Sequence, residues 1–447
     1  MHFLRRARVP VACLPAALSA GLDAQARRFE PWVECDLSIE GRTITAVTKS
    51  GAAAPRDGAT VTDLGGSLVF PGLVDAHTHL DKTHTWHRAP NPTGEFWDAI
   101  DVLGRDSALW TADDVRTRAA FGLRQAWAHG TVAIRTHLDA GSARGEVSHE
   151  VIASLREEWA DRLTVQTVSM CNLAELPATG ATRVLQVATA HGASALGGFP
   201  QPNPDLARQL DWLFAAARDA GLGVDLHVDE SGLAHAECLR ATAEAVLRNQ
   251  FPHPVACGHC CSLAVQDPER AASTIGLIKA AGLTVIALPM CNLYLQHRGR
   301  SPSDPQGERG LRRTPLWRGV TLIHELIDAG VPVAAASDNV RDAFHAWGDY
   351  DLLEVLSQSI RIAHLDTRLD CAPALVSSTP ASALGLTDTG RVGPGARADL
   401  IVTSAVTFNE LLARPAAPRR LIHGESFREV TLPSLSELPP SLRHPSV

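Results

Sequence analysis

Hydrophobic and polar positions along this chain alternate in the way that is typical of a parallel sheet. Short apolar, β-branched runs recur through its middle, and longer segments with helical periodicity separate them. Eight such runs with intervening helices predict an α/β fold, a (β/α)8 TIM-type barrel. The predicted strands are 67–79, 131–139, 163–170, 193–200, 223–230, 255–262, 284–292 and 331–339. The predicted helices include 111–129, 204–220, 232–248, 268–281 and 319–329.

The two ends of the chain carry a different pattern, with short alternating segments and glycine turns. We expect both ends to form one small β-sandwich domain beside the barrel. The predicted limits are 1–66 and 386–447 for the small β domain and 67–385 for the barrel. The predicted strands of the small domain are 3–12, 34–39, 43–47, 60–63, 390–402, 420–422 and 429–432.

The first twenty residues admit a second interpretation. Three arginines precede the apolar stretch 9–20, which resembles a secretory signal. Pro10 and Pro15 interrupt that stretch, so the pattern favours a first β-strand.

Composition narrows the class of partner and the compartment. The chain has 447 residues and a net charge of −8, which argues against nucleic acid or an acidic membrane surface as a partner. No apolar run reaches the ~18 residues of a membrane span. Nine cysteines, an odd number, indicate a reducing cytoplasm rather than a disulfide framework. The sequence allows a homo-oligomer without specifying one.

His77 and His79 stand at the end of the first predicted barrel strand. Side chains at positions i and i+2 of a strand point to the same face, so two imidazoles there can hold one metal ion. Polar residues end several other predicted strands, and in such barrels these ends converge on the active site. They are His137, Glu230, His259, Asn292 and Asp338.

A metal site of three histidines and one aspartate is the chemistry that these positions suggest. His227 can join the histidine pair, and Asp338 supplies a carboxylate, leaving a position for water on Zn²⁺ or Fe²⁺. Glu230 then stands where a carboxylate could move protons. Each residue alone has a plainer explanation as a core histidine, a solvated acid or a helix N-cap. Their placement at the ends of the right strands favours the metal site.

Five segments together resemble the amidohydrolase superfamily, and within it the cytosine deaminase-like branch. The segments are 71–82, 135–139, 227–230, 258–259 and 337–342, and the similarity extends over essentially the whole chain. The resemblance implies that His77, His79, His227 and Asp338 bind the metal. It further implies that Glu230 shuttles protons, and that His259 and Asp338 act on the metal-bound hydroxide that attacks an amine-bearing ring carbon.

The lysine content bears on the number of metal ions. Dinuclear members of the superfamily bridge their ions with a carbamylated lysine at the end of strand four. This chain has only Lys49, Lys82 and Lys279, none of them in 193–200. We therefore expect one divalent ion, Zn or Fe.

The residues that would read the substrate depart from the cytosine deaminase pattern. Met170 or Asn172 stands where a glutamine reads the pyrimidine, Asn339 replaces an aspartate, and Phe344 replaces a stacking tryptophan. The shorter Asn172 side chain favours a different or larger ring, with a carbonyl near Asn339. Cytosine is therefore expected to be a poor substrate.

The sequence thus predicts a metal-dependent hydrolytic deaminase of a small nitrogen heterocycle. A cyclic amidase or an aminotriazine (ammelide-type) aminohydrolase on the same scaffold is the alternative, and a non-catalytic barrel of this kind is the rival from a different class. Cys257 and Cys260 match the spacing of disulfide-exchange centres, but they end an apolar strand instead of starting a helix. The loop 299–311 is a candidate lid.

Overall fold

The computed structural model describes all residues except 21, 23–27, 176–180, 300–302, 304–311 and 444–447. The predicted lid, 299–311, therefore lies almost wholly outside the described residues. The chain divides into two compact units. One comprises Met1–Ala76, Arg124–Ile134 and Asp351–Pro433, and the other His77–Leu123, Arg135–Tyr350 and Ser434–Val447. The domain limits drawn from the sequence stay a prediction.

An eight-stranded sheet confirms the predicted (β/α)8 barrel. Each strand lies beside its neighbour in the chain, and the printed pairings from β8 to β13 are all parallel. A parallel bridge between Thr78 and Asp338 connects the first strand to the segment after the last one. The strands are β6 (Leu73–Thr78), β7 (Thr131–Asp139), β8 (Thr164–Asn172), β9 (Ala195–Phe199), β10 (Gly223–Val228), β11 (Val255–His259), β12 (Thr284–Ala287) and β13 (Val333–Ala335).

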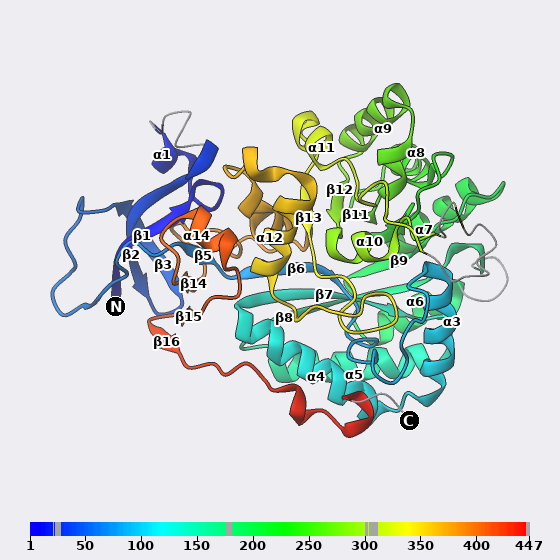
Figure 1. The fold of residues 1–447 in the computed structure, drawn as a ribbon, viewed down its shortest axis with the longest axis horizontal. Helices are drawn as coiled ribbons and strands as arrows, with labels where there is room; N and C mark the ends of the chain where they lie inside the picture. Colours follow the sequence, from blue (N-terminus) through cyan, green and yellow to red (C-terminus); the bar gives the residue numbers. More distant parts are fainter. Residues whose placement is uncertain (21, 23–27, 176–180, 300–302, 304–311, 444–447) are drawn as a thin grey trace. The chain divides into compact units, whose positions relative to one another are not determined.

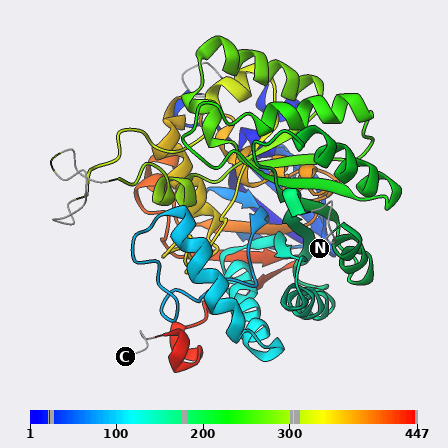
Figure 2. The same cartoon turned by 90° about the vertical axis from the view of Figure 1, so that its right-hand side faces the viewer.

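Helices cover the outside of this sheet, as Figures 1 and 2 show for the green helices of the second unit. Adjacent helices pack on one another in chain order, α7 on α8, α8 on α9 and α9 on α11. Local signals set their ends: Asp267 accepts hydrogen bonds from the backbone of Glu269 and Arg270, and Pro268 starts α9. The helices are α3 (Phe96–Asp106), α4 (Ala112–His129), α5 (Ala143–Trp159), α6 (Ala181–Ala190), α7 (Leu206–Asp219), α8 (Cys238–Asn249), α9 (Pro268–Ala280), α10 (Pro289–Leu295), α11 (Ile323–Ala329) and α12 (Leu352–Ala363). Shorter ones are α1 (Ala16–Ser19), α13 (Ser378–Ala383) and α14 (Phe408–Ala413).

Several predicted strands were wrong in their extent. The segment 390–402, for example, is a strand only from Asp399, in β14 (Asp399–Thr403), and the run 331–339 only over Val333–Ala335. The run 67–79 is two strands, because its first part, β5 (Val69–Pro71), pairs with β14 outside the barrel. The run 284–292 ends at Ala287, because Pro289 suits the first turn of a helix and Asn292 therefore lies on α10. The segment 429–432 is not a strand, and the strand of that region is β16 (Ser426–Arg428).

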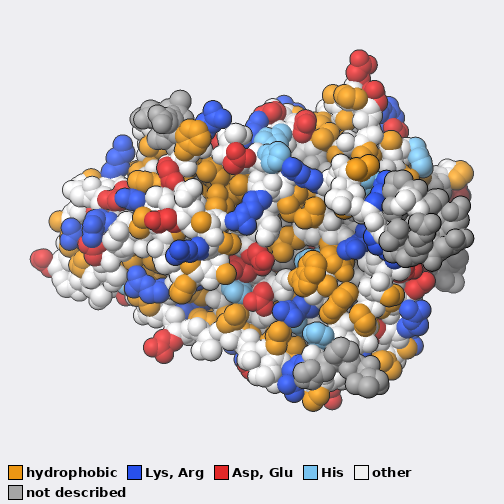
Figure 3. All heavy atoms as spheres, in the orientation of Figure 1, with side chains coloured by type: hydrophobic (Ala, Val, Ile, Leu, Met, Phe, Trp, Pro, Cys, Tyr) orange, Lys and Arg blue, Asp and Glu red, His pale blue; other side chains and the backbone are white. Residues whose placement is uncertain are grey.

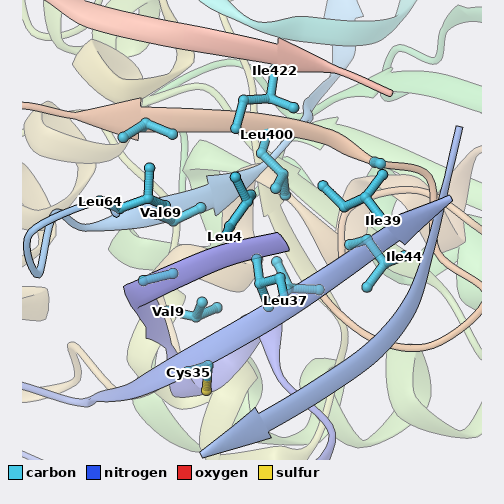
Figure 4. Close-up of a cluster of buried hydrophobic side chains, with 14 of the residues drawn as sticks. Leu4, Val9, Cys35, Leu37, Ile39, Ile44, Leu64, Val69, Leu400 and Ile422 are labelled. Carbon is cyan, nitrogen blue, oxygen red and sulfur yellow. The ribbon is translucent and has the colours of Figure 1, made fainter. Parts of the chain in front are cut away.

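Two four-stranded sheets form the predicted small β-sandwich. One has the order β3-β2-β1-β4 and the other β16-β15-β14-β5. Their facing sides share one apolar core, with Leu37 and Ile39 of the first sheet and Leu400 and Ile422 of the second sheet all buried (Figure 4). The strands are β1 (His2–Pro10), β2 (Trp32–Glu40), β3 (Thr43–Lys49), β4 (Thr60–Asp63), β14 (Asp399–Thr403) and β15 (Arg419–His423), with β5 and β16. β1 confirms the strand interpretation of the first residues.

Acidic and basic side chains are mixed over the face shown in Figure 3, without a continuous basic surface among the described residues there. Within the described chain, none of the helices combines the length and the apolar character that crossing a membrane requires.

Candidate active site

Four side chains that were predicted as metal ligands converge at the ends of three barrel strands. His77 lies on β6 with His79 just beyond it, His227 lies on β10, and Asp338 follows β13. The Nε2 atoms of His77 and His79 lie 3.1 and 3.2 Å from Nε2 of His227. The same two atoms lie 3.7 and 3.4 Å from Oδ1 of Asp338. All four belong to the second compact unit.

This geometry fits a metal ion. Ligand atoms of a tetrahedral zinc site, with bonds of about 2.0–2.1 Å, lie about 3.3 Å apart. Three facing imidazole nitrogens cannot all satisfy one another, because a neutral ring donates through one nitrogen only. Neither oxygen of the buried Asp338 carboxylate accepts a hydrogen bond of normal geometry from the described residues. A cation between these atoms would satisfy all four.

The protonation states also suit metal binding. Burial, followed by the neighbouring histidines, holds the pKa of His77 and His227 well below the ordinary value. Burial likewise lowers the pKa of His79. Neutral imidazoles are the form that binds metal. The three histidines are therefore already in the metal-binding form near neutral pH.

Glu230 and His259 lie beside these ligands and are joined to each other through Asn292. Oε1 of Glu230 is 3.3 Å from Nδ1 of His259, and Asn292 places its Nδ2 at 3.2 and 3.0 Å from these two atoms. Gln296 donates to the backbone oxygen of Glu230 at 3.1 Å. The sequence pointed to Asn292 as a strand end but not to this role, which depends on Asn292 lying on α10 and Gln296 capping the end of that helix one turn later.

Burial changes the pKa of both Glu230 and His259. Burial and the nearby Asp338 charge raise the pKa of Glu230 well above its ordinary range. Burial lowers the pKa of His259 to about 4. A carboxyl group with a raised pKa can both give and take a proton near neutral pH, as acid–base catalysis requires.

The backbone is strained where the strands deliver these groups. His259 has φ 70°, Asp338 has φ 59°, and Asp229, next to Glu230, has φ 49°. Residues other than glycine seldom adopt positive φ, and such conformations gather at functional sites. Asp229 is held by the backbone N–H groups of Cys238 and Leu239 at 3.1 and 2.9 Å, which fixes the turn.

A buried ion network lies against the histidines, and sequence reasoning missed its role. Asp225 is fully buried, and its carboxylate lies 3.0 Å from Nη1 of Arg135 and 3.2 Å from Nε2 of His137. The ring of His137 is centred 3.9 Å from that of His77. The sequence did contain a signal for this network. Arg135 and His137 stand two residues apart on one strand, and Asp225 and His227 stand two residues apart on another, so each pair shares one face of its strand.

Of the predicted substrate-reading residues, Met170 and Asn172 lie on β8. Met170 pairs with Gly197, which in turn pairs with Asp225, so these three positions share the inner face of the barrel. Met170 is buried. The Asn172 amide is already engaged locally, with Nδ2 at 3.3 Å from Glu175 and Oδ1 accepting from the backbone of Ala174 at 3.1 Å.

Asn339 and Phe344 lie on the segment after β13. Asn339 donates through Nδ2 to the buried Asp342 carboxylate at 2.6 Å, so its Oδ1 is the atom left to accept. Asp342 takes one of the two hydrogens on Nδ2, so a ring carbonyl near Asn339 would have to accept from the other, and this placement stays a prediction. Phe344 packs edge-to-face on Phe96, with ring centroids 5.7 Å apart, in an apolar cluster that includes Cys291.

The cysteine pair Cys257 and Cys260 does not resemble a disulfide-exchange centre. Both are free and buried, and burial raises the pKa of both thiols. Exchange centres lower the thiol pKa at a helix N-terminus, which is the opposite environment.

Gly258, on β11, makes room for the ring of His77. A methyl group at this glycine would lie 2.9 Å from Cε1 and 3.0 Å from Nδ1 of His77, closer than carbon atoms pack. We expect Gly258→Ala to displace that ring and to lower the metal content of the purified protein about tenfold, within the range that supporting residues show. Gly276→Ala is the control, because a methyl group there meets no described atom within 4 Å. Equal metal content in both variants would contradict this role.

Comparisons with known proteins place the chain in a family. A model described as the amidohydrolase family matches residues 180–427. A pterin deaminase of Rhizobium rhizogenes strain K84 is 42% identical over 96% of this chain and 94% of its own length. An N-isopropylammelide isopropyl amidohydrolase of Pseudomonas sp. strain ADP is 23% identical over 83% of this chain and 88% of its own.

A solved structure shows the same fold. It is the 5-methylcytosine deaminase of Klebsiella pneumoniae, with a TM-score of 0.79, 23% identity, and coverage of 97% of this chain and 100% of that one. The chain belongs to the amidohydrolase family, a metal-dependent family, and it is a hydrolase that acts on carbon–nitrogen bonds. The predicted superfamily and enzyme class are confirmed.

Proposed function

We propose that this protein is a hydrolytic deaminase of a pterin-type ring and works with one divalent ion, Zn²⁺ or Fe²⁺. The observation that supports it most is the convergence of His77, His79, His227 and Asp338 beside Glu230, a largely buried carboxyl group whose pKa is raised. The 42% identity with a pterin deaminase over nearly the full length of both chains supports the choice of ring.

His77, His79, His227 and Asp338 would hold the ion. When bound, such an ion supplies Lewis acidity and brings the pKa of water towards neutrality. A single ion is proposed because β9 contains none of the three lysines, so a lysine bridge between two ions is not available there.

Glu230 takes the proton of the attacking water and delivers it to the ring nitrogen next to the amine-bearing carbon. Its raised pKa lets it hold that proton between the two transfers. His259, joined to Glu230 through Asn292, donates a hydrogen bond to the attacking oxygen and keeps it in line with the ring. Asp338 takes the second proton of the water and passes it to the amine, so ammonia leaves and a ring carbonyl replaces the amine.

The substrate-reading residues support a ring larger than cytosine. Asn172 is shorter than the glutamine of the cytosine deaminase pattern, and its side-chain amide is already hydrogen-bonded to the Glu175 carboxylate and to the backbone N–H of Ala174. Asn339 offers an acceptor, Oδ1, which suits a ring N–H or amine. Phe344 and Phe96 give an apolar wall for the second ring of a pteridine.

This proposal predicts a strong preference among substrates. We expect kcat/KM for pterin to lie in the range of about 10⁴–10⁸ M⁻¹s⁻¹ that enzymes show for their own substrates. Cytosine should be at least about 100-fold poorer, because a site built for paired hydrogen bonds discriminates against a ring that leaves them unmade. Ammonia release at matched concentrations of pterin, cytosine, ammelide and creatinine measures this. A cytosine value equal to that for pterin would overturn the substrate assignment.

An ammelide-type aminohydrolase is the second candidate, supported by the relative from Pseudomonas. Such an enzyme would act on a substrate with one ring and would release a different amine. The same substrate panel distinguishes this activity from pterin deamination. A cyclic amidase would open the ring and release no ammonia.

Two finer points belong to the same proposal. We place the enzyme in the cytoplasm, because its nine cysteines are free and eight of them are buried. We keep the domain limits 1–66, 67–385 and 386–447, with the central segment carrying every proposed ligand.

A further inference from the structure

A thiol lies at the edge of the proposed metal site and has no part in the chemistry above. Cys291, on α10, is 1% exposed. Its sulfur forms a group with a carboxylate oxygen of Glu230 and one of Asp338, and these three atoms all lie within 4.8 Å of one another. Sγ of Cys291 is also 3.9 Å from Oδ1 of Asn339.

These three groups make a ligand set of their own. A thiolate and two carboxylates suit Zn²⁺, whose sulfur and oxygen ligands lie about 3.6 Å apart in a tetrahedral site. Side-chain shifts of about 1 Å would bring the present atoms to that spacing. The Asp338 carboxylate accepts no hydrogen bond of normal geometry from the described residues, and one of its oxygens remains once the other faces His77 and His79.

We propose that Glu230, Cys291 and Asp338 form a second, inhibitory site for a thiophilic divalent cation such as Zn²⁺ or Cd²⁺. Asp338 bridges this site and the three-histidine site through its two oxygens. Carboxylate-bridged ions about 3.5–4 Å apart are common in two-metal centres.

Occupation of this site removes the proton shuttle. A carboxylate bound to a cation no longer accepts and donates protons freely, so excess zinc should stop turnover without displacing the first ion. This consequence rests on the role of Glu230 in the proposed function. The binding itself does not, and it can be measured separately.

Binding is tested on the holoenzyme with one equivalent of metal already bound. Adding Cd²⁺ should produce the ultraviolet thiolate-to-cadmium charge-transfer band, saturating at one further equivalent by elemental analysis. The three-histidine site has no sulfur and cannot give this band. Cys291→Ala should lose the band, whereas Cys35→Ala, a fully buried cysteine in the small β unit, should keep it. A band that persists in Cys291→Ala, or no band in the wild type, overturns the site.

Activity gives the second readout. Zinc added beyond one equivalent should inhibit the wild type, and Cys291→Ala should need about tenfold more zinc or greater for the same inhibition, because the soft ligand is gone. Inhibition unchanged by Cys291→Ala overturns the inhibitory role. If the enzyme turns over no heterocycle, the proposed function is wrong. The cadmium band still shows whether Cys291 belongs to a second metal site.

Discussion

Replacing Glu230 by glutamine is expected to lower kcat by about 10²–10⁴-fold, the usual contribution of a general acid–base group. The amide keeps the size and the hydrogen bonds of the carboxyl but cannot carry a proton between water and ring. The metal content should stay at one equivalent, because Glu230 is not among the four proposed ligands. Steady-state kinetics with pterin and elemental analysis of the same preparation measure both quantities.

The matched control for this change is Glu244→Gln, an exposed position on α8 where the carboxylate pairs with Arg240. Its kcat should equal that of the wild type. Near-normal turnover in Glu230→Gln would exclude the shuttle role. Loss of metal in that variant would instead make Glu230 a ligand and would reopen the assignment of Asp338.

Removing the metal by chelation is expected to abolish activity and to lower the melting temperature. An ion that binds only the folded state stabilises it by about 4 kcal/mol when its free concentration is 1,000 times Kd. Removal also leaves three facing imidazole nitrogens that cannot all satisfy one another, beside a buried Asp338 carboxylate that accepts no hydrogen bond of normal geometry from the described residues. Both activity and melting temperature should return when one equivalent of Zn²⁺ or Fe²⁺ is restored.

A ligand variant separates this effect from general damage. His227→Ala should contain little metal, and added Zn²⁺ should raise its melting temperature much less than that of the metal-free wild type. His191→Ala, a partly exposed histidine beyond α6, should behave as the wild type does. Two tightly bound equivalents of metal in the purified wild type, with a modified lysine, would contradict the single-ion proposal.

Much of the barrel could be predicted because its signals are local. Each strand is a short apolar run, and a polar residue marks the point where several of them emerge, as at His79, Glu230 and His259. The parallel topology then brings those points together, although they lie far apart in the chain. That is why four side chains could be predicted to converge before any contact was known; their role as metal ligands stays a proposal.

The remaining features depend on contacts that periodicity does not encode. Pro289 started a helix inside a run that looked continuous, so Asn292 moved to α10, and pairing with β14 drew β5 out of the first predicted barrel strand into the small sandwich. The Asn339 amide turned out to be fixed by Asp342, three residues later. The partners of His137 became visible only when the neighbouring strands placed Asp225 beside it.

The most direct test of the central claim is the product that the purified holoenzyme makes from pterin, identified by mass spectrometry together with measured ammonia. The proposed deaminase predicts one ammonia per pterin consumed and a product that keeps both rings, with oxygen in place of the amino nitrogen. A product formed by addition of water without release of ammonia, or unchanged pterin in the presence of a full equivalent of metal, would contradict it.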